Sequence, residues 1–140
     1  DAEEEEEEEE EDFIDEADKE FKLPPLNLKN VFEYNRWTHC QQRIQFHTNN
    51  LQLEARSIIP TYYESIREAR NALIRSYKLL FLLDPSQLSY GVFEFHINNL
   101  ERFVYKMATN YFWPNDEKIV KCCRNLIKTL YMHANEINFN

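Results

Sequence analysis

One glycine, Gly91, occurs in a chain of 140 residues, and this scarcity restricts the folds that the chain can adopt. Tight β-hairpins and the loops that cradle phosphates use glycine where the backbone turns sharply. Prolines mark the breaks between elements instead, and they divide the chain into segments of helical length. The five prolines are Pro24, Pro25, Pro60, Pro85 and Pro114. The sequence therefore predicts helices joined by short connections.

Apolar periodicity places these helices near residues 28–58, 60–83, 86–112 and 116–136, because apolar residues recur there at steps of three and four. The four stripes are Trp37, Cys40, Ile44, His47, Leu51 and Ile58, interrupted by Glu54; Tyr62, Ile66, Ala69, Leu73, Tyr77 and Leu80; Phe93, Ile97, Leu100, Val104, Met107 and Tyr111; and Ile119, Cys123, Leu126, Leu130, His133 and Ile137. Short connections favour antiparallel neighbours. We predict an all-α fold, an antiparallel bundle of about four amphipathic helices.

Helix ends carry matching signals. Pro60 and Pro85 suit the first turn of a helix, where the missing N–H costs nothing. Pro114 is expected to end the third helix, and Asn115 or Asp116 to cap the fourth.

The charge is divided unevenly along the chain. Residues 1–20 hold fifteen Asp or Glu and one Lys, a net charge of -14, whereas the whole chain carries -9, so residues 21–140 carry the difference, +5. Like charges repel, so we predict a disordered acidic tail or linker over residues 1–22 and a helical domain over residues 23–140. Phe13, Ile14 and Phe21 lie among acids near the end of this tail, which is either a short docking motif or an inert linker.

The longest apolar run, residues 79–83, is too short to span a membrane, and the acidic N-terminus is unlike a signal peptide. The three cysteines, Cys40, Cys122 and Cys123, form no CxxC pair. An odd number of cysteines without such pairs indicates free thiols in a reducing compartment, and a cytoplasmic or nuclear location is expected.

His39, Cys40 and His47 lie close together in the first helix and raise the question of a metal site. His39 and Cys40 point about 100 degrees apart on a helix, and no third ligand follows Cys40 at i+4. Cys40 also lacks free backbone amides for an oxyanion hole, because mid-helix amides are already bonded. We therefore predict no metal, cofactor or catalytic residue in this chain.

Charged residues of the body suggest further possibilities. Glu94 and Glu101 are expected on helix surfaces, which argues against a pair of catalytic carboxylates. Basic residues gather on the second and fourth helices: Arg67, Arg70, Arg75 and Lys78; Lys118, Lys121, Arg124 and Lys128. A basic face can bind nucleic acid, dock an acidic protein or simply be solvated. The acidic tail would compete with phosphate, which makes nucleic acid the weakest of the three.

Two segments resemble the Ariadne domain, the helical C-terminal module of Ariadne-type RING-between-RING ubiquitin ligases. The first, "FEYNRWTHCQQRIQF", matches its opening helix through Asn35, Arg36, Trp37, Ile44 and Phe46. The second, "ARNALIRSYKLLFLL" followed by the loop "DPSQLSYG", matches through Arg70, Leu73, Ser76 and Tyr77, and then through Phe93, Glu94, Leu100 and Glu101. The resemblance covers residues 30–136.

This resemblance implies a regulatory role. In such ligases the Ariadne domain packs on the second RING-type domain, hides its catalytic cysteine, and is released by a neddylated cullin-RING ligase. The ubiquitin-conjugating enzyme and the zinc ions bind RING-type domains of a parent ligase, which three cysteines cannot supply. The chain itself is therefore not expected to be catalytic.

The chain departs from the family at its contact positions. Of three residues that the family uses against the catalytic domain, Phe46 is retained, an acidic residue is replaced by His47, and a glutamate is replaced by Tyr105. These three are the candidate protein contacts. The alternative hypothesis is a helical scaffold or adaptor, unrelated to ubiquitin, whose basic face docks an acidic protein.

Overall fold

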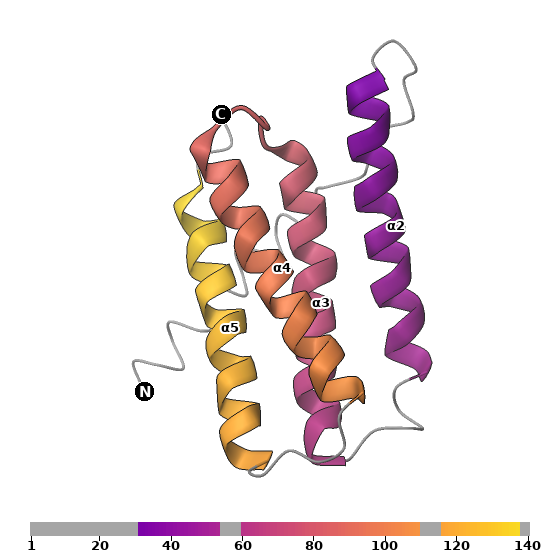
Figure 1. The fold of residues 1–140 in the computed structure, drawn as a ribbon, viewed down its shortest axis with the longest axis vertical. Helices are drawn as coiled ribbons and strands as arrows, with labels where there is room; N and C mark the ends of the chain where they lie inside the picture. The colour runs from indigo at the N-terminus through magenta and orange to yellow at the C-terminus, as the bar shows by residue number, and fades with distance from the viewer. Residues whose placement is uncertain (1–30, 54–59, 110–115, 138–140) are drawn as a thin grey trace.

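The structure is a computed structural model that describes residues 31–53, 60–109 and 116–137. The described residues form four helices: α2 (Val31–Leu53), α3 (Pro60–Leu82), α4 (Leu88–Thr109) and α5 (Asp116–Glu136). The ribbon runs down α2, up α3, down α4 and up α5 (Figure 1). The predicted antiparallel bundle of four helices is thus confirmed. The acidic tail, the ends of the first predicted helix and the predicted cap at Asn115 lie outside the described residues.

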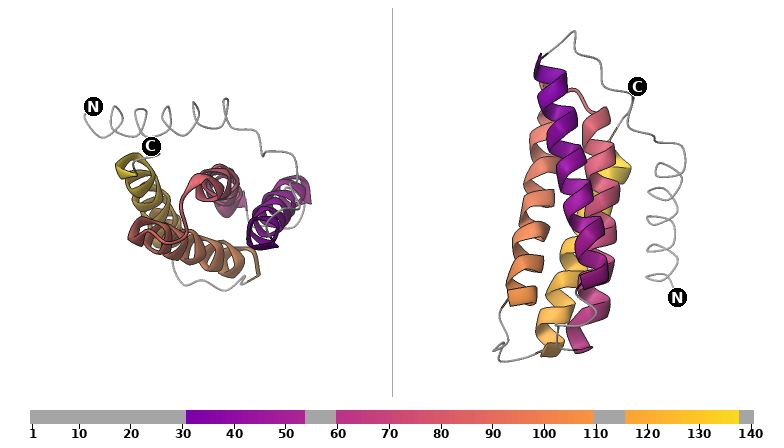
Figure 2. Two further views of the ribbon diagram at one scale, coloured as in Figure 1. Left: turned by 90° about the horizontal axis from the view of Figure 1, so that it is seen from above. Right: turned by 90° about the vertical axis from the view of Figure 1, so that its right-hand side faces the viewer.

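α3 is the central helix. It packs against α2, α4 and α5, and α4 also packs against α5. Seen from above, α2 and α5 lie on opposite sides of α3, and α4 closes one face (Figure 2). The molecule is therefore a three-helix unit of α3, α4 and α5 with α2 added along one side of α3.

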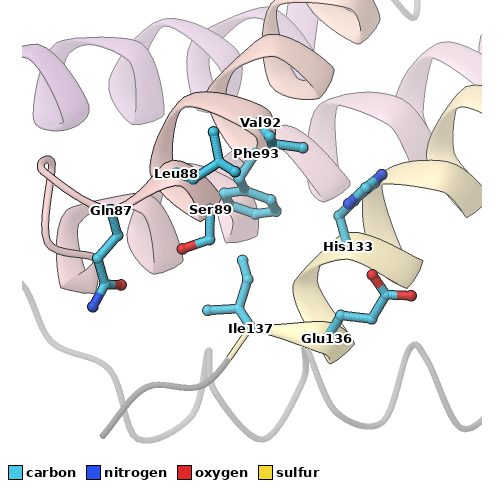
Figure 3. A pocket seen from close by; sticks show the side chains of 8 residues that line it. All are labelled: Gln87, Leu88, Ser89, Val92, Phe93, His133, Glu136 and Ile137. Carbon is cyan, nitrogen blue, oxygen red and sulfur yellow. The ribbon is translucent and has the colours of Figure 1, made fainter.

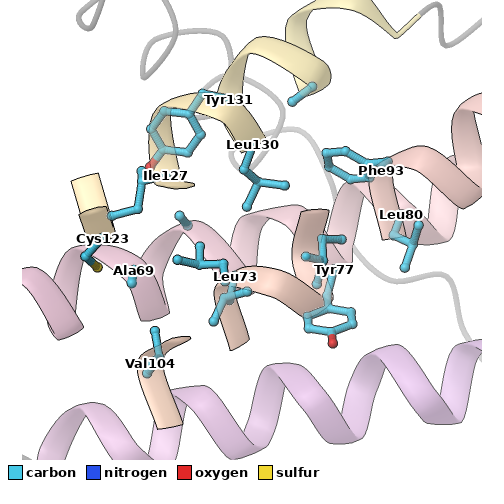
Figure 4. Close-up of a cluster of buried hydrophobic side chains, with 14 of the residues drawn as sticks. Ala69, Leu73, Tyr77, Leu80, Phe93, Val104, Cys123, Ile127, Leu130 and Tyr131 are labelled. Carbon is cyan, nitrogen blue, oxygen red and sulfur yellow. The ribbon is translucent and has the colours of Figure 1, made fainter. Parts of the chain in front are cut away.

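The core follows from this arrangement. All six residues of the predicted stripe on α3 are buried, as are the five of α4 that the structure describes: Phe93, Ile97, Leu100, Val104 and Met107. Side chains of α3, α4 and α5 interdigitate in this core (Figure 4). Among the described residues of α2, Cys40 alone joins the buried apolar cluster. The other apolar positions predicted to face inward, Trp37, Ile44 and Leu51, are only half-buried.

Two sequence predictions need correction. α4 begins at Leu88, so Pro85 lies in the preceding turn and not in the first turn of the helix. The turn is fixed instead by Asp84, whose Oδ1 accepts hydrogen bonds from the backbone N–H and the hydroxyl of Ser86. On α5, Leu126 and His133 are half-buried, and the inner face is completed by Ile127, Tyr131 and Ala134.

Candidate functional site

Five polar side chains from three helices meet between α2, α3 and α4, and we name them the polar cluster: Arg43 and His47 of α2, Arg70 and Tyr77 of α3, and Glu101 of α4. Residues 43 and 47 are four apart and so lie on one face of α2. Residues 70 and 77 are two turns apart on α3. Helical spacing therefore explains how each pair reaches the same place.

Glu101 is the acceptor at the centre of the polar cluster. Its Oε2 accepts from Nε of Arg43 at 3.0 Å and from Nε2 of His47 at 2.7 Å, and its Oε1 accepts from the hydroxyl of Tyr77. Burial by itself would raise the pKa of Glu101, but the bonds from His47, Tyr77 and Arg43 outweigh it and lower this pKa to about 2. The carboxylate is therefore ionised throughout the physiological pH range.

His47 is neutral in this arrangement, and its tautomer is fixed. Nδ1 lies 2.9 Å from Nη1 of Arg70, which can only donate, so Nδ1 accepts and Nε2 carries the proton given to Glu101. Burial lowers the pKa of His47 most, and the charges of Arg70 and Arg43 lower it further, against the raising effect of Glu101. The imidazole is only 1% exposed.

Two exposed aromatic residues flank the polar cluster. Phe46 of α2 is 45% exposed, and the guanidinium carbons of Arg43 and Arg70 lie 4.7 Å and 5.7 Å from its ring centroid. Tyr105 of α4 is 69% exposed and lies one turn beyond Glu101, on the side of α4 that faces α2. The polar cluster thus supports a surface on which two aromatic rings reach solvent.

Arg36 anchors the other half of α2. Its Nη2 donates to the carbonyls of Phe81 and Leu83 at 2.8 Å each, at the C-terminal end of α3, where carbonyls lack partners within the helix. Its guanidinium also lies over the rings of Phe81 and Tyr90. α2 is therefore fastened by polar groups at two levels.

The residues that carry the family resemblance lie in several different environments. Arg70, Tyr77 and Glu101 belong to the polar cluster, whereas Leu73, Phe93 and Leu100 are core residues. Arg36, Trp37, Ile44 and Glu94 are half-buried, and Asn35 is exposed. Of the three candidate protein contacts, Phe46 and Tyr105 are accessible, but His47 is buried.

Glu94 and Glu101 were predicted on helix surfaces; Glu94 is half-buried, and for Glu101 the prediction is wrong. The side chain of Glu101 is only 14% exposed, and Arg70 is buried against His47. Of the basic residues on α3, Arg67 is exposed and Arg70 is buried. The role of Arg43 was missed, although its i, i+4 spacing to His47 on the inner stripe offered a signal.

On α5 the basic residues lie as the sequence predicted. Lys118, Lys121 and Arg124 are exposed, and Lys128 is half-buried. This leaves a basic face along the side of the helix that is turned away from the core.

Two of the three cysteines, Cys40 and Cys123, are buried, and their environment disfavours the reactive thiolate. Burial raises the pKa of Cys40 to about 11 and that of Cys123 to about 12. The thiol of Cys123 points to the carbonyl of Ser65 at 3.7 Å. Within the described part of the chain, no group of three or more His, Cys, Asp or Glu side chains could hold a metal ion.

A separate cavity of about 540 Å³ lies between the start of α4 and the end of α5 (Figure 3). Leu88, Val92, Phe93 and Ile137 provide its apolar wall, and His133 and Glu136 lie at its edge. The ring of His133 stacks on that of His96 with centroids 4.1 Å apart. This cavity shares no residue with the polar cluster.

Comparison with known proteins adds no relative: no protein-family model matches the chain, and no curated protein or solved structure is significantly similar to it. No helix in the described segments has the length and apolar character needed to cross a bilayer.

Proposed function

We propose that this domain is an Ariadne-like regulatory module that restrains a RING-between-RING ubiquitin ligase by packing on its catalytic RING-type domain. The observation that carries the proposal is Phe46, the retained family contact, whose ring is held at the surface above Arg43 and Arg70. A large exposed aromatic residue with a fixed position is typical of an interface anchor. The resemblance supplies the identity of the partner.

The polar cluster supports the same proposal. Arg70, Tyr77 and Glu101 are singled out by the resemblance at separate places in the sequence, and they converge in the polar cluster, where Arg70 also lies against the ring of Phe46. Their bonds fix α2 against α3 and α4, so they set the position of the proposed contact surface. A neddylated cullin-RING ligase would then release the domain by competing for this surface or by distorting it.

The replaced family positions alter the chemistry of the contact. His47 is buried, so it affects the proposed contact surface only through its hydrogen bonds to Glu101 and Arg70. Tyr105 presents an aromatic ring where the family has a carboxylate. The proposed surface is therefore more apolar than that of the family, and we expect its binding to depend less on salt.

Ubiquitin transfer by a RING-between-RING catalytic fragment without its own helical domain tests the proposal. Adding the full 140-residue chain should slow transfer from the ubiquitin-conjugating enzyme to substrate. Phe46→Ala should raise the concentration of the chain needed for half-maximal inhibition at least tenfold. Phe95→Ala is the matched control, since Phe95 is a 56% exposed aromatic residue of α4 outside the polar cluster. Transfer that is unchanged by the wild-type chain, together with no binding, would contradict the proposal.

The basic face of α5 favours a second candidate, a scaffold or adaptor that docks an acidic protein. Lys121 and Arg124 are exposed there, and the next acid along the chain is Glu136. Binding of this kind should weaken steeply between 50 and about 300 mM salt and be lost in Lys121→Glu/Arg124→Glu. The Phe46→Ala variant should bind normally in that case, which separates the two candidates.

A further inference from the structure

α2 is held by different means along its two halves. The N-terminal half is fastened by Arg36 to the carbonyls at the end of α3, and Cys40 is buried in the apolar core. Over residues 43–51 the described side chains add no buried apolar residue, since Ile44 and Leu51 are half-buried and Phe46 is exposed. Apart from Ile44, which packs half-buried against the core, the C-terminal half therefore depends on the polar cluster for its position.

His47 is the group of the polar cluster whose charge can change under mild conditions. Facing it are Arg43 on its own helix, Arg70 and Tyr77 on α3, and Glu101 on α4. Both arginines and the carboxylate are charged, and Tyr77 is neutral because burial and Glu101 raise the pKa of its phenol. With His47 neutral, the polar cluster thus holds two cations and one anion.

A second proton on His47 has no place in this geometry. It would occupy the Nδ1 lone pair, which already accepts from Arg70, so two donors would then face each other at 2.9 Å. Three cations would also share one carboxylate in a largely buried site. Movement of the C-terminal half of α2 away from α3 and α4 relieves both conflicts, because it separates His47 from Arg70 and the cations of α2 from the buried site.

We propose that His47 makes the C-terminal half of α2 a proton-sensitive element: protonation releases residues 43–51 from α3 and α4 while Arg36 keeps the N-terminal half docked. This inference stands on the polar cluster and is independent of any ubiquitin ligase. Most of the stability of a helix in a protein comes from tertiary packing, so a segment that loses its contacts with α3 and α4 frays from its C-terminal end. Release therefore unfolds the segment and displaces Phe46.

The direction of the pH effect follows from the lowered pKa of His47. The docked state takes up the proton less readily than the released state, in which His47 has its ordinary pKa of 6.5. Docking is therefore most stable above pH 6.5 and weakens as the pH falls below it. Uptake of one proton increases the opening constant by about tenfold for each pH unit until the docked pKa is reached.

Hydrogen exchange on the full chain, corrected for the intrinsic pH dependence of amide exchange, measures this opening. Between pH 6 and pH 5 the protection factors of residues 43–51 should fall several-fold, up to about tenfold, while those of residues 36–40 stay constant. His47→Gln keeps a neutral polar side chain and should remove the pH dependence. His39→Gln is the matched control, because His39 is exposed on the same helix and touches Tyr77 only by its ring edge at 5.9 Å.

Three results would overturn the proposal: equal pH slopes in His47→Gln and wild type, loss of the slope in His39→Gln, or equal loss of protection along the whole of α2. Titration of the His47 ring by NMR in the wild-type chain provides a test that needs no variant. A pKa below 6.5 with α2 shifts that follow the same curve supports the proposal. A pKa of 6.5 or higher contradicts it.

Discussion

Glu101 shows how a single carboxylate can position a helix without adding much net stability. Its desolvation opposes folding, and bonds to three donors from α2 and α3 offset that cost. Buried ionic groups often contribute little compared with apolar replacements, but removing one partner leaves the others uncompensated. The polar cluster should therefore be sensitive to truncation of any one member.

Glu101→Ala should lower the free energy of unfolding by about 3 kcal/mol, because Arg43, His47 and Tyr77 all lose their shared acceptor. Glu101→Gln retains one acceptor oxygen and should lose about 1 to 2 kcal/mol. Urea denaturation measures both values, with Glu117→Ala on the exposed start of α5 as the control at less than about 0.5 kcal/mol. Equal effects of Glu101→Ala and Glu117→Ala would show that the cluster does not form in solution.

The pH dependence of stability separates Glu101 from His47. The pKa of Glu101 is lowered from 4.5 to about 2 in the fold, so its contribution is present above pH 4.5 and is lost as the pH falls toward 2. Urea titrations at pH 5 and pH 3 should show that the free energy of unfolding falls less between these two pH values in Glu101→Gln than in wild type. A parallel loss in the two proteins would assign acid unfolding to other carboxylates.

Charged residues were the least predictable part of the site. Glu101 follows Leu100 of the inner stripe, and a carboxylate at such a boundary position is usually solvated. One sequence gives no distance between residues 43, 47, 70, 77 and 101, and only packing of three helices brings them together. The candidate contact residue Phe46 comes from the resemblance and not from periodicity.

The burial of helix residues was predicted most accurately for the helix that the other helices surround. α3 touches three helices, and every residue of its predicted stripe is buried. α2 lies at the edge, and its stripe is only half-buried apart from Cys40 and His47. Periodicity reveals which face of a helix is turned inward, but the depth of burial depends on how many neighbours cover that face.

Replacing Arg36 is expected to cost stability that a lysine at the same position does not recover. Arg36→Ala should lower the free energy of unfolding by about 2 kcal/mol, since two carbonyls at the end of α3 lose their donor. Arg36→Lys should recover less than half of that loss, because an ammonium group does not reproduce the planar guanidinium that stacks on Phe81 and Tyr90. Thermal unfolding checks the order, with exposed Arg67→Ala as the control. Full recovery by lysine would contradict the geometry.

A substitution at Gly91 is expected to stabilise the protein rather than destabilise it. It lies in α4 with an ordinary negative φ, and a Cβ placed there meets no atom within 4 Å. Gly91→Ala should therefore raise the free energy of unfolding by about 0.5 to 1 kcal/mol, since alanine loses less backbone entropy on folding. Urea denaturation measures the gain. A loss of stability would mean that this turn of α4 is not helical in solution.

The whole molecule combines a densely packed three-helix unit with a helix held largely by polar contacts. Nearly all of the buried apolar residues belong to α3, α4 and α5, whereas α2 depends on Arg36 and the polar cluster. Uneven packing of this kind allows parts of a domain to open at different free energies. Cooperative unfolding of all four helices therefore depends on a small number of polar bonds.

Two variants should reveal this division when the two helical parts are followed by separate probes. Trp37 of α2 reports on α2 in a Trp113→Phe background, and far-ultraviolet circular dichroism reports on all helices. Leu73→Ala, in the centre of α3, should lower the stability by about 3 kcal/mol with both probes still coincident, because it damages the shared core. Arg36→Ala/Glu101→Ala should shift the Trp37 transition to lower urea, well before the main loss of helix, because both anchors of α2 are removed. Coincident transitions in this double variant would show that α2 and the three-helix unit unfold as one, and the half-buried apolar residues of α2 would then hold it more strongly than its polar bonds do.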